Sequence, residues 1–219
     1  MSALLAGLSI LVIGDSHMAT NGYLISGLHD ELSRAGAAVY SYGACGVPAG
    51  AWMTRSASFC GGAVRIGNGT VEELTGAAAA TTPLPELVRR HKPDLVVVVA
   101  GDTMAGYGQN AMPKNWIWQQ VTTLSKGIAN AGVGCVWVGP PWGSEGGRFA
   151  KTYARVREVS DFLSGNVAPC VYVDSLAMAA PGAWKTIDGQ HLDGAGYRVW
   201  GSAIAAAIES PAVFNRIRK

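Results

Sequence analysis

The sequence predicts an α/β fold, a three-layer α/β/α sandwich built on a five-stranded, parallel, doubly wound sheet. Short apolar runs alternate with amphipathic stretches along most of the chain, which is the pattern of strand–helix–strand units. Residues 95–99 are apolar without interruption, as expected of a parallel strand that helices cover on both faces. Glycines follow several of the apolar runs, where the chain must turn sharply after a strand.

Each predicted strand is a short run rich in β-branched or aromatic residues. In chain order these runs are residues 9–13, 38–42, 95–99, 135–138 and 171–173. The carboxyl ends of parallel strands lie at one edge of the sheet, where ligands bind in this fold class. Because Ser16, Gly101 and Gly139 follow three of these runs, we expect the functional loops at that edge.

Amphipathic stretches between the strands predict the helices, at about 20–35, 84–91, 114–131, 147–164 and 194–209. Asp193 or Gly194 can begin the last helix, and Pro211 follows its end. Beyond it, the basic residues 216–219 are predicted to form a short exposed tail.

The segment at about 43–82 breaks this alternation of strands and helices. It is rich in Gly, Ser, Thr and Ala and is long for a connection between two core elements. A loop insertion of that length is usually functional or has a small structure of its own. No internal repeat or second domain is evident, so residues 1–219 are predicted to form a single domain.

Composition and charge narrow the class of protein. With 49% hydrophobic and 15% charged residues, the chain has the composition of a soluble globular protein. The net charge of +2, without a basic stripe interleaved with aromatic residues, argues against a nucleic-acid partner. No run approaches the ~20 apolar residues of a transmembrane segment. The N-terminus lacks the basic region and cleavage site of a leader, so we expect a cytoplasmic protein, or a periplasmic or secreted one if a leader has been removed.

The four cysteines show neither a CxxC pair nor a Cys/His zinc spacing. Cys135 and Cys170 fall in strand-like segments, where a cysteine is most simply a small buried hydrophobic residue. Cys45 and Cys60 could meet across a loop. A disulfide between them is the less favoured interpretation, because nothing else in the sequence indicates a fold stabilised by disulfides.

Two short motifs at opposite ends of the chain carry the chemistry. Gly14-Asp15-Ser16-His17 follows the first apolar run, and Asp188-Gly189-Gln190-His191 precedes the last helix. A serine hydroxyl becomes a nucleophile when an imidazole accepts its proton and a carboxylate orients that imidazole. Each residue alone has a plainer interpretation, as a helix cap, a turn or a surface histidine. Their combination predicts the catalytic triad Ser16, Asp188 and His191.

These motifs resemble the conserved blocks of the SGNH hydrolases, the superfamily of GDSL-type esterases and lipases. Gly14-Asp15-Ser16 is similar to the first block, and Asp188 to Leu192 with Gly196-Tyr197 to the last. Gly43-Ala44-Cys45-Gly46 resembles the second block. The resemblance implies a flavodoxin-like α/β sandwich, with the backbone N–H groups of Ser16 and Gly46 in an oxyanion hole.

The third block departs from the family pattern. Gly101-Asp102-Thr103-Met104 stands where the family has Gly-x-Asn-Asp, so Thr103 occupies the position of the oxyanion-hole asparagine. A threonine hydroxyl can donate one hydrogen bond, although its reach and direction differ from those of an amide. Losing one such donor typically lowers turnover about 100-fold or more. Either Thr103 serves as the third donor of the oxyanion hole, or Asp102 or the nearby Asn110 reshapes the hole, or the enzyme is slow.

Four further residues are candidates for substrate binding. His17 follows the proposed nucleophile, and Trp142 lies after the fourth predicted strand. Trp52 and Arg55 lie in the 43–82 insertion and could hold a sugar ring and an acidic group. The competing interpretation is a solvated or packed side chain for His17, a plain loop for Trp142, and packing within their own loop for Trp52 and Arg55.

Chemistry and resemblance together predict a serine esterase that hydrolyses short acyl esters, with O-acetyl groups on a carbohydrate or glycan as the leading hypothesis. A carbohydrate O-acyltransferase with the same triad is an alternative, since only the acceptor of the acyl group differs. A catalytically weak glycan-binding or scaffold protein is the alternative of another class, motivated by Thr103. No metal ion or organic cofactor is expected. The partner is a small-molecule or glycan ester, and the sequence does not predict the oligomeric state.

Overall fold

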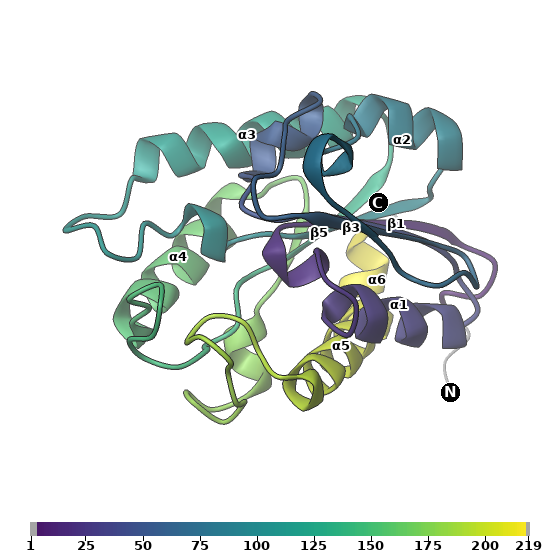
Figure 1. Ribbon diagram of the computed structural model, residues 1–219. Coiled ribbons are helices and arrows are strands. Elements are labelled where there is room, and N and C mark those ends of the chain that lie inside the picture. Colours follow the sequence, from purple (N-terminus) through teal and green to yellow (C-terminus); the bar gives the residue numbers. More distant parts are fainter. Residues whose placement is uncertain (1–3, 218–219) are drawn as a thin grey trace.

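The computed structural model describes residues 4–217. At their centre lies one sheet (Figure 1), and its strand order is β4-β3-β2-β1-β5-β6-β7. The two strands at one edge, β3 (Gly62–Ile66) and β4 (Glu72–Leu74), are antiparallel to their neighbours. The other five are mutually parallel and are those predicted: β1 (Ser9–Gly14), β2 (Ala38–Ala44), β5 (Leu95–Val99), β6 (Gly134–Val138) and β7 (Val171–Val173).

The central strands supply alternate residues to two apolar cores, one on each face of the sheet. In β1, Leu11 and Ile13 belong to one core, and Ile10 and Val12 belong to the other. All residues of β5 are buried, as its uninterrupted apolar sequence predicts. Each such side chain stabilises the fold by about 1.5–3 kcal/mol when fully buried.

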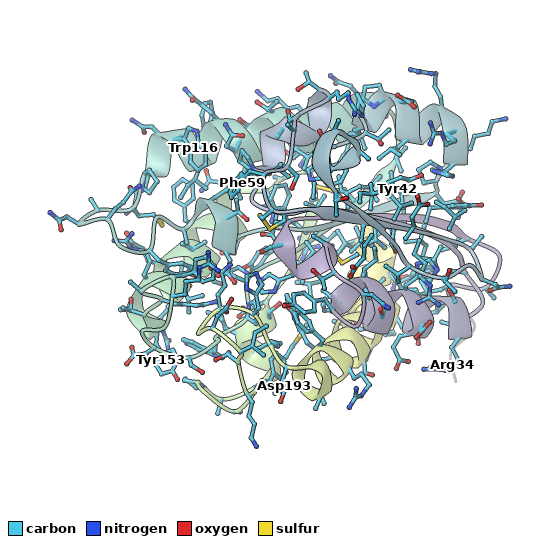
Figure 2. All side chains as sticks on the ribbon, in the orientation of Figure 1. Arg34, Tyr42, Phe59, Trp116, Tyr153 and Asp193 are labelled. Carbon is cyan, nitrogen blue, oxygen red and sulfur yellow. A yellow bond between two sulfur atoms is a disulfide. The ribbon has the colours of Figure 1, made fainter. Side chains whose placement is uncertain are left out.

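Helices cover both faces of the sheet, which confirms the predicted α/β class (Figure 1). Figure 2 shows side chains filling the space between the layers. The helix α4 begins later than predicted, at Tyr153. One face carries α2 (Leu84–His91), α3 (Lys114–Asn130) and α4 (Tyr153–Asn166), and the other carries α1 (Leu24–Arg34), α5 (Gly194–Glu209) and α6 (Pro211–Ile217).

The helix α6 follows α5 and includes Arg216 and Ile217, the first two residues of the predicted tail, and Arg216 is exposed as predicted. Pro211 is its first residue. A proline fits there because the N–H it lacks would have no acceptor within the helix. The hydroxyl of Ser210 accepts a hydrogen bond from the backbone N–H of Val213 at 3.3 Å, which caps the first turn. Phe214 is buried in the adjacent core. Residues 218–219 of the predicted tail lie outside the described residues.

The 43–82 segment has a small structure of its own. Besides β3 and β4, it contains two short 3-10 turns, Ala49–Met53 and Gly76–Ala78. The sheet therefore has two strands beyond the five predicted, because β3 pairs with β2 in antiparallel register. Sequence alone did not predict these strands, since they are short and lie at an edge with few apolar residues.

Both pairs of cysteines form disulfides, which corrects the sequence analysis. Cys135 and Cys170 directly precede Val136 and Val171, which are partners in the β6–β7 register. Their Cα atoms are 4.5 Å apart, within the range that a disulfide spans. Cys45 and Cys60 close a loop of the 43–82 segment. Neither proximity is visible in the spacing of the cysteines along the chain.

His29 of α1 is fully buried. Its Nε2 donates a hydrogen bond to the carbonyl oxygen of Gly67 at 2.8 Å, and its Nδ1 accepts one from the hydroxyl of Ser41 at 2.8 Å. Burial lowers the pKa of His29 to about 4. Among residues 4–217, no helix combines the length and the apolar character needed to span a bilayer.

Candidate active site

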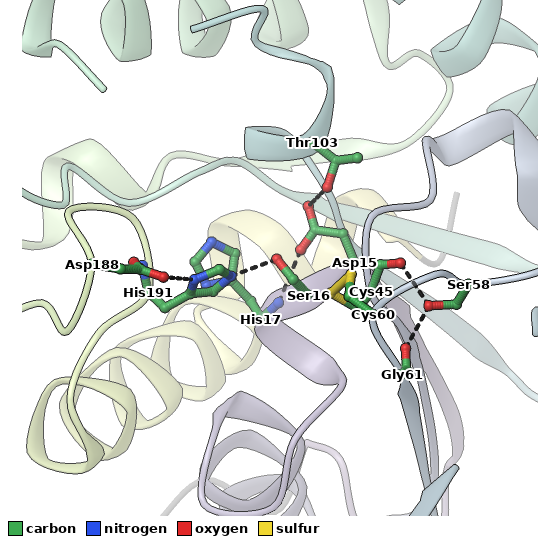
Figure 3. Close-up of a disulfide and its surroundings, with 10 residues drawn as sticks. All are labelled: Asp15, Ser16, His17, Cys45, Ser58, Cys60, Gly61, Thr103, Asp188 and His191. Carbon is green, nitrogen blue, oxygen red and sulfur yellow. Dashed lines mark hydrogen bonds and ion pairs between the residues drawn. A yellow bond between two sulfur atoms is a disulfide. The ribbon is translucent and has the colours of Figure 1, made fainter. Parts of the chain in front are cut away.

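The two distant motifs meet at the carboxyl edge of the sheet (Figure 3). Ser16 begins a short 3-10 turn directly after β1, and Asp188 and His191 lie in the loop before α5. The hydroxyl of Ser16 donates to Nε2 of His191 at 2.7 Å. Nδ1–H of His191 donates to Oδ2 of Asp188 at 2.7 Å. The structure thus brings the three predicted triad residues into one chain of hydrogen bonds.

Glycines make room for this arrangement. A Cβ at Gly43 would lie 2.0 Å from the carbonyl oxygen of Met18, so only glycine lets the turn of Ser16 approach the end of β2. Gly189 has a φ of +94°, which a residue with a side chain rarely adopts. The tight turn at Gly189 allows the N–H of Gln190 and of His191 to donate to Oδ1 of Asp188, at 3.0 and 2.8 Å.

The surroundings of His191 keep it neutral. Burial lowers the pKa of His191 below its usual 6.5, and the neighbouring His17 lowers it further, while Asp188 opposes both effects. Burial alone would raise the pKa of Asp188, but the hydrogen bonds from His191 and Gln190 lower it below its usual value. At neutral pH, an ionised Asp188 therefore orients a neutral imidazole whose Nε2 can accept the proton of Ser16.

The predicted oxyanion residues lie around the same space. Ser16, Gly46 and Thr103 line, with His191, a cavity of about 750 Å³. The backbone N–H groups of Ser16 and Gly46 donate to no backbone acceptor within residues 4–217, and Gly46 has a φ of +76°. They are available to an oxygen atom in the cavity.

Thr103 is placed differently from the expectation. Its hydroxyl donates to Oδ2 of Asp15 at 3.1 Å, so its hydrogen is directed at a carboxylate and not into the cavity. The other oxygen of Asp15 accepts from the N–H of His17 at 3.2 Å. Asp15 thus has the structural role of holding the turn that carries Ser16.

None of the four predicted substrate-binding residues lines the cavity. Trp52 is buried in the core beside α3, and the indole N–H of Trp142 donates to the carbonyl oxygens of Leu176 and Ala179. The guanidinium of Arg55 donates to the carbonyl oxygen of Ala77 at 3.0 Å. For these three residues the competing interpretation, packing within their own loops or core, describes the structure.

His17 belongs to a buried cluster of hydrogen-bonded polar side chains around Asp102 that sequence reasoning missed. Its Nε2 lies 2.8 Å from Oδ2 of Asp102, and Nδ1 lies 2.9 Å from the hydroxyl of Tyr197. Nζ of Lys151 donates to both oxygens of Asp102, at 2.8 and 2.9 Å, and to the carbonyl oxygen of Pro141 at 2.8 Å. The hydroxyl of Tyr107 also donates to Asp102.

This cluster fastens a loop to the active site. Burial lowers the pKa of Lys151, whereas Lys151 and His17 hold the pKa of Asp102 below its usual value against the opposing effect of burial. Lys151 follows Arg148 and Phe149, both of which line the cavity. The ring of Phe149 packs edge-on against the ring of His191, with the two ring centroids 5.5 Å apart. No local sequence signal joins Lys151 to Asp102, since 49 residues separate them.

Among residues 4–217, no group of three or more His, Cys, Asp or Glu side chains is arranged to hold a metal ion.

Comparisons with known proteins place the chain beside one curated protein and many solved structures. Protein BcsX of Komagataeibacter xylinus is 44% identical over 208 residues, which cover 94% of this chain and 79% of that protein. A GDSL-like lipase from Bacteroides thetaiotaomicron has a TM-score of 0.58 at 14% identity, covering 91% of this chain and 87% of its own. A peptidoglycan O-acetylesterase has a TM-score of 0.57 at 13% identity, covering 97% and 94%. No protein-family model matches the chain.

Proposed function

Because the chain belongs to the family of protein BcsX and has the SGNH hydrolase fold, we propose that it is a serine esterase that removes short acyl groups, chiefly O-acetyl groups, from a carbohydrate. The observation that carries this proposal is the hydrogen-bonded chain from Ser16 through His191 to Asp188, which opens on a cavity. Neutral His191 and ionised Asp188 are the protonation states that such a triad requires.

The proposed reaction uses the same triad in both half-reactions. Nε2 of His191 takes the proton of Ser16 as the oxygen attacks the acyl carbonyl, and the N–H groups of Ser16 and Gly46 receive the negative oxygen. His191 then gives the proton to the departing alcohol. A water molecule, deprotonated by His191, attacks the acyl-serine, and His191 returns this proton to the oxygen of Ser16 as the acid is released.

The carbohydrate part of the proposal is supported by the cavity. Its volume of about 750 Å³ exceeds the needs of an acetyl group, and it is lined by both aromatic and polar side chains, which suits the faces and hydroxyls of a sugar. A solved structure with the same fold is a peptidoglycan O-acetylesterase.

Acetate release tests the proposal. Wild type, Ser16→Ala and His191→Ala are incubated with 4-nitrophenyl acetate and with O-acetylated xylo-oligosaccharides, and free acetate is quantified. We expect release by wild type alone. Acetate that moves to an added unacetylated oligosaccharide, detected by mass spectrometry, would identify an acyltransferase instead. A folded wild type that consumes neither ester, and whose Ser16 does not react with a fluorophosphonate, would support a scaffold or glycan-binding protein.

We also propose that the protein works in an oxidising compartment, the periplasm or the cell exterior, in place of the cytoplasm expected from the sequence. The support is its two disulfides, which persist in such compartments and are rare in the cytosol. Alkylation of protein isolated from its native cells, followed by mass measurement, tests this. We expect no cysteine to be alkylated, because all four are in disulfides, whereas alkylation of four free thiols would contradict the proposal.

A further inference from the structure

One aromatic side chain at the cavity has a free face. Phe59 is 86% exposed, although it lines the same cavity as Ser16 and His191. The other aromatic rings there are held by neighbours, since Tyr23 stacks on Tyr197 at 4.5 Å and Phe149 contacts His191. A large apolar side chain exposed at a cavity marks a contact surface more often than one scattered elsewhere.

The backbone on both sides of Phe59 is fixed. Cys60, its neighbour in sequence, is bonded to Cys45 (Figure 3). The hydroxyl of Ser58, on its other side, lies 2.7 Å from the carbonyl oxygen of Cys45 and 2.5 Å from that of Gly61. The N–H of Cys45 also donates to Gly61 at 2.9 Å. Because the turn is already ordered, a ligand that contacts Phe59 would lose little conformational entropy in ordering it.

This turn also places Phe59 next to the proposed oxyanion hole. A Cβ at Gly46 would lie 2.5 Å from the ring of Phe59, so the ring lies against the backbone of Gly46. If the carbonyl oxygen of an ester accepts a hydrogen bond from the N–H of Gly46, a group next to that carbonyl would therefore lie against the ring of Phe59.

We propose that Phe59, held by the Cys45–Cys60 disulfide, is a stacking platform for a sugar ring of the substrate. The inference rests on the proposed function and deepens it, because it assigns the residue that binds the carbohydrate side of the ester. The C–H face of a pyranose packs on an aromatic ring. Polar side chains of Gln109, Arg148 and Gln190 line the cavity within the same space and can bond the hydroxyls, which favours a sugar over an acyl chain.

Kinetics on three esters test the platform. We expect Phe59→Ala to raise KM for an O-acetylated xylo-oligosaccharide about three- to tenfold, the effect of one lost stacking contact. KM for 4-nitrophenyl acetate should change by less than about twofold, because this ester has no sugar. Phe59→Trp, which keeps an aromatic ring at this position, should have a KM for the sugar ester close to that of wild type. Trp118→Ala is the matched control, since Trp118 is exposed but lies outside the cavity.

The third ester is 4-nitrophenyl octanoate. If Phe59→Ala raises KM for the octanoate and leaves KM for the sugar ester unchanged, the ring binds an acyl chain and the platform proposal is wrong. Equal effects on all three esters, or none on any, would also overturn it. Reaction of Ser16 with a fluorophosphonate separates the two levels: an unreactive Ser16 ends the proposed function, whereas a reactive Ser16 with no preference at Phe59 ends only this inference.

Binding without turnover gives a second readout. Calorimetric titration of Ser16→Ala with xylo-, gluco- and N-acetylglucosamine oligosaccharides is expected to show binding of at least one of them. Adding Phe59→Ala should weaken that binding about three- to tenfold. Unchanged affinity, or the absence of binding to any of the three oligosaccharides, would contradict the platform.

The role of the disulfide is tested by comparing the two disulfides of the chain. Cys45→Ser with Cys60→Ser should raise KM for the sugar ester as Phe59→Ala does. Cys135→Ser with Cys170→Ser should leave it unchanged, because that disulfide joins strands and does not line the cavity. Should the first variant fail to fold, Ser58→Ala loosens the same turn without removing the sulfurs. If KM for the sugar ester is the same without the Cys45–Cys60 disulfide as in wild type, Phe59 does not need the support of that disulfide.

Discussion

His191 can act as a base only while its imidazole is neutral, so its pKa sets the acid limb of activity. Burial and His17 lower that pKa below 6.5, and the neutral form therefore persists to lower pH than in an ordinary histidine. We predict that kcat/KM for 4-nitrophenyl acetate rises with pH through a midpoint below about 6.5. A pH–rate profile measures it. A midpoint clearly above that value would contradict the described surroundings of His191.

Thr103 is a second residue whose chemistry the structure specifies. Because its hydroxyl donates to Asp15, we predict that Thr103→Val lowers kcat by less than about tenfold, whereas removal of an oxyanion donor costs about 100-fold or more. The unfolding free energy should fall by about 1–3 kcal/mol, since buried Asp15 loses a donor. Thr103→Ser, which keeps the hydroxyl, is the control. A 100-fold loss of turnover at unchanged stability would assign Thr103 to the oxyanion hole.

At the scale of elements, a buried ion pair helps to hold the loop that follows β6. Lys151 and Asp102 are both fully buried in the structure. We predict that Lys151→Met lowers the unfolding free energy by about 3–5 kcal/mol, because buried Asp102 loses its lysine partner and keeps only its contacts with His17 and Tyr107. Chemical denaturation measures this effect. Lys151→Met combined with Asp102→Asn should recover at least half of the loss, and a double variant as unstable as the single one would contradict the pairing.

Elements also show how far the sequence could be interpreted. Periodicity predicted the five parallel strands because their apolar runs are uninterrupted or nearly so, and the two motifs predicted which residues meet at the carboxyl edge. The direction of a side chain leaves no such trace, so Trp52 and Trp142 were candidates for substrate binding although both pack in the core. Contacts between distant residues, such as Lys151 with Asp102 or Cys135 with Cys170, depend on the tertiary arrangement and were missed for that reason.

At the scale of the whole molecule, buried histidines make stability depend on pH. The pKa of His29 falls from 6.5 to about 4 on folding, so the unfolded chain binds the proton more tightly. The associated stability, about 3 kcal/mol, is fully present above pH 6.5 and is lost as the pH falls towards 4.

We predict that the free energy of unfolding of wild type decreases as the pH falls from 7 to 4. In His29→Gln the same decrease with pH should be less steep. Denaturant titrations of both proteins over this range measure the difference. His91 and His191 also have lowered pKa values and remain in the variant, so some slope is expected to persist. Identical slopes in the two proteins would show that His29 is not buried as a neutral side chain.

The most direct test of the account is the reaction of Ser16 with a fluorophosphonate, located by peptide mass mapping. We expect one adduct per chain, on Ser16, and a labelling rate at least about 1,000-fold lower in folded His191→Ala, because the imidazole activates the hydroxyl. A folded wild type without the adduct, or His191→Ala labelled as fast as wild type, would contradict it.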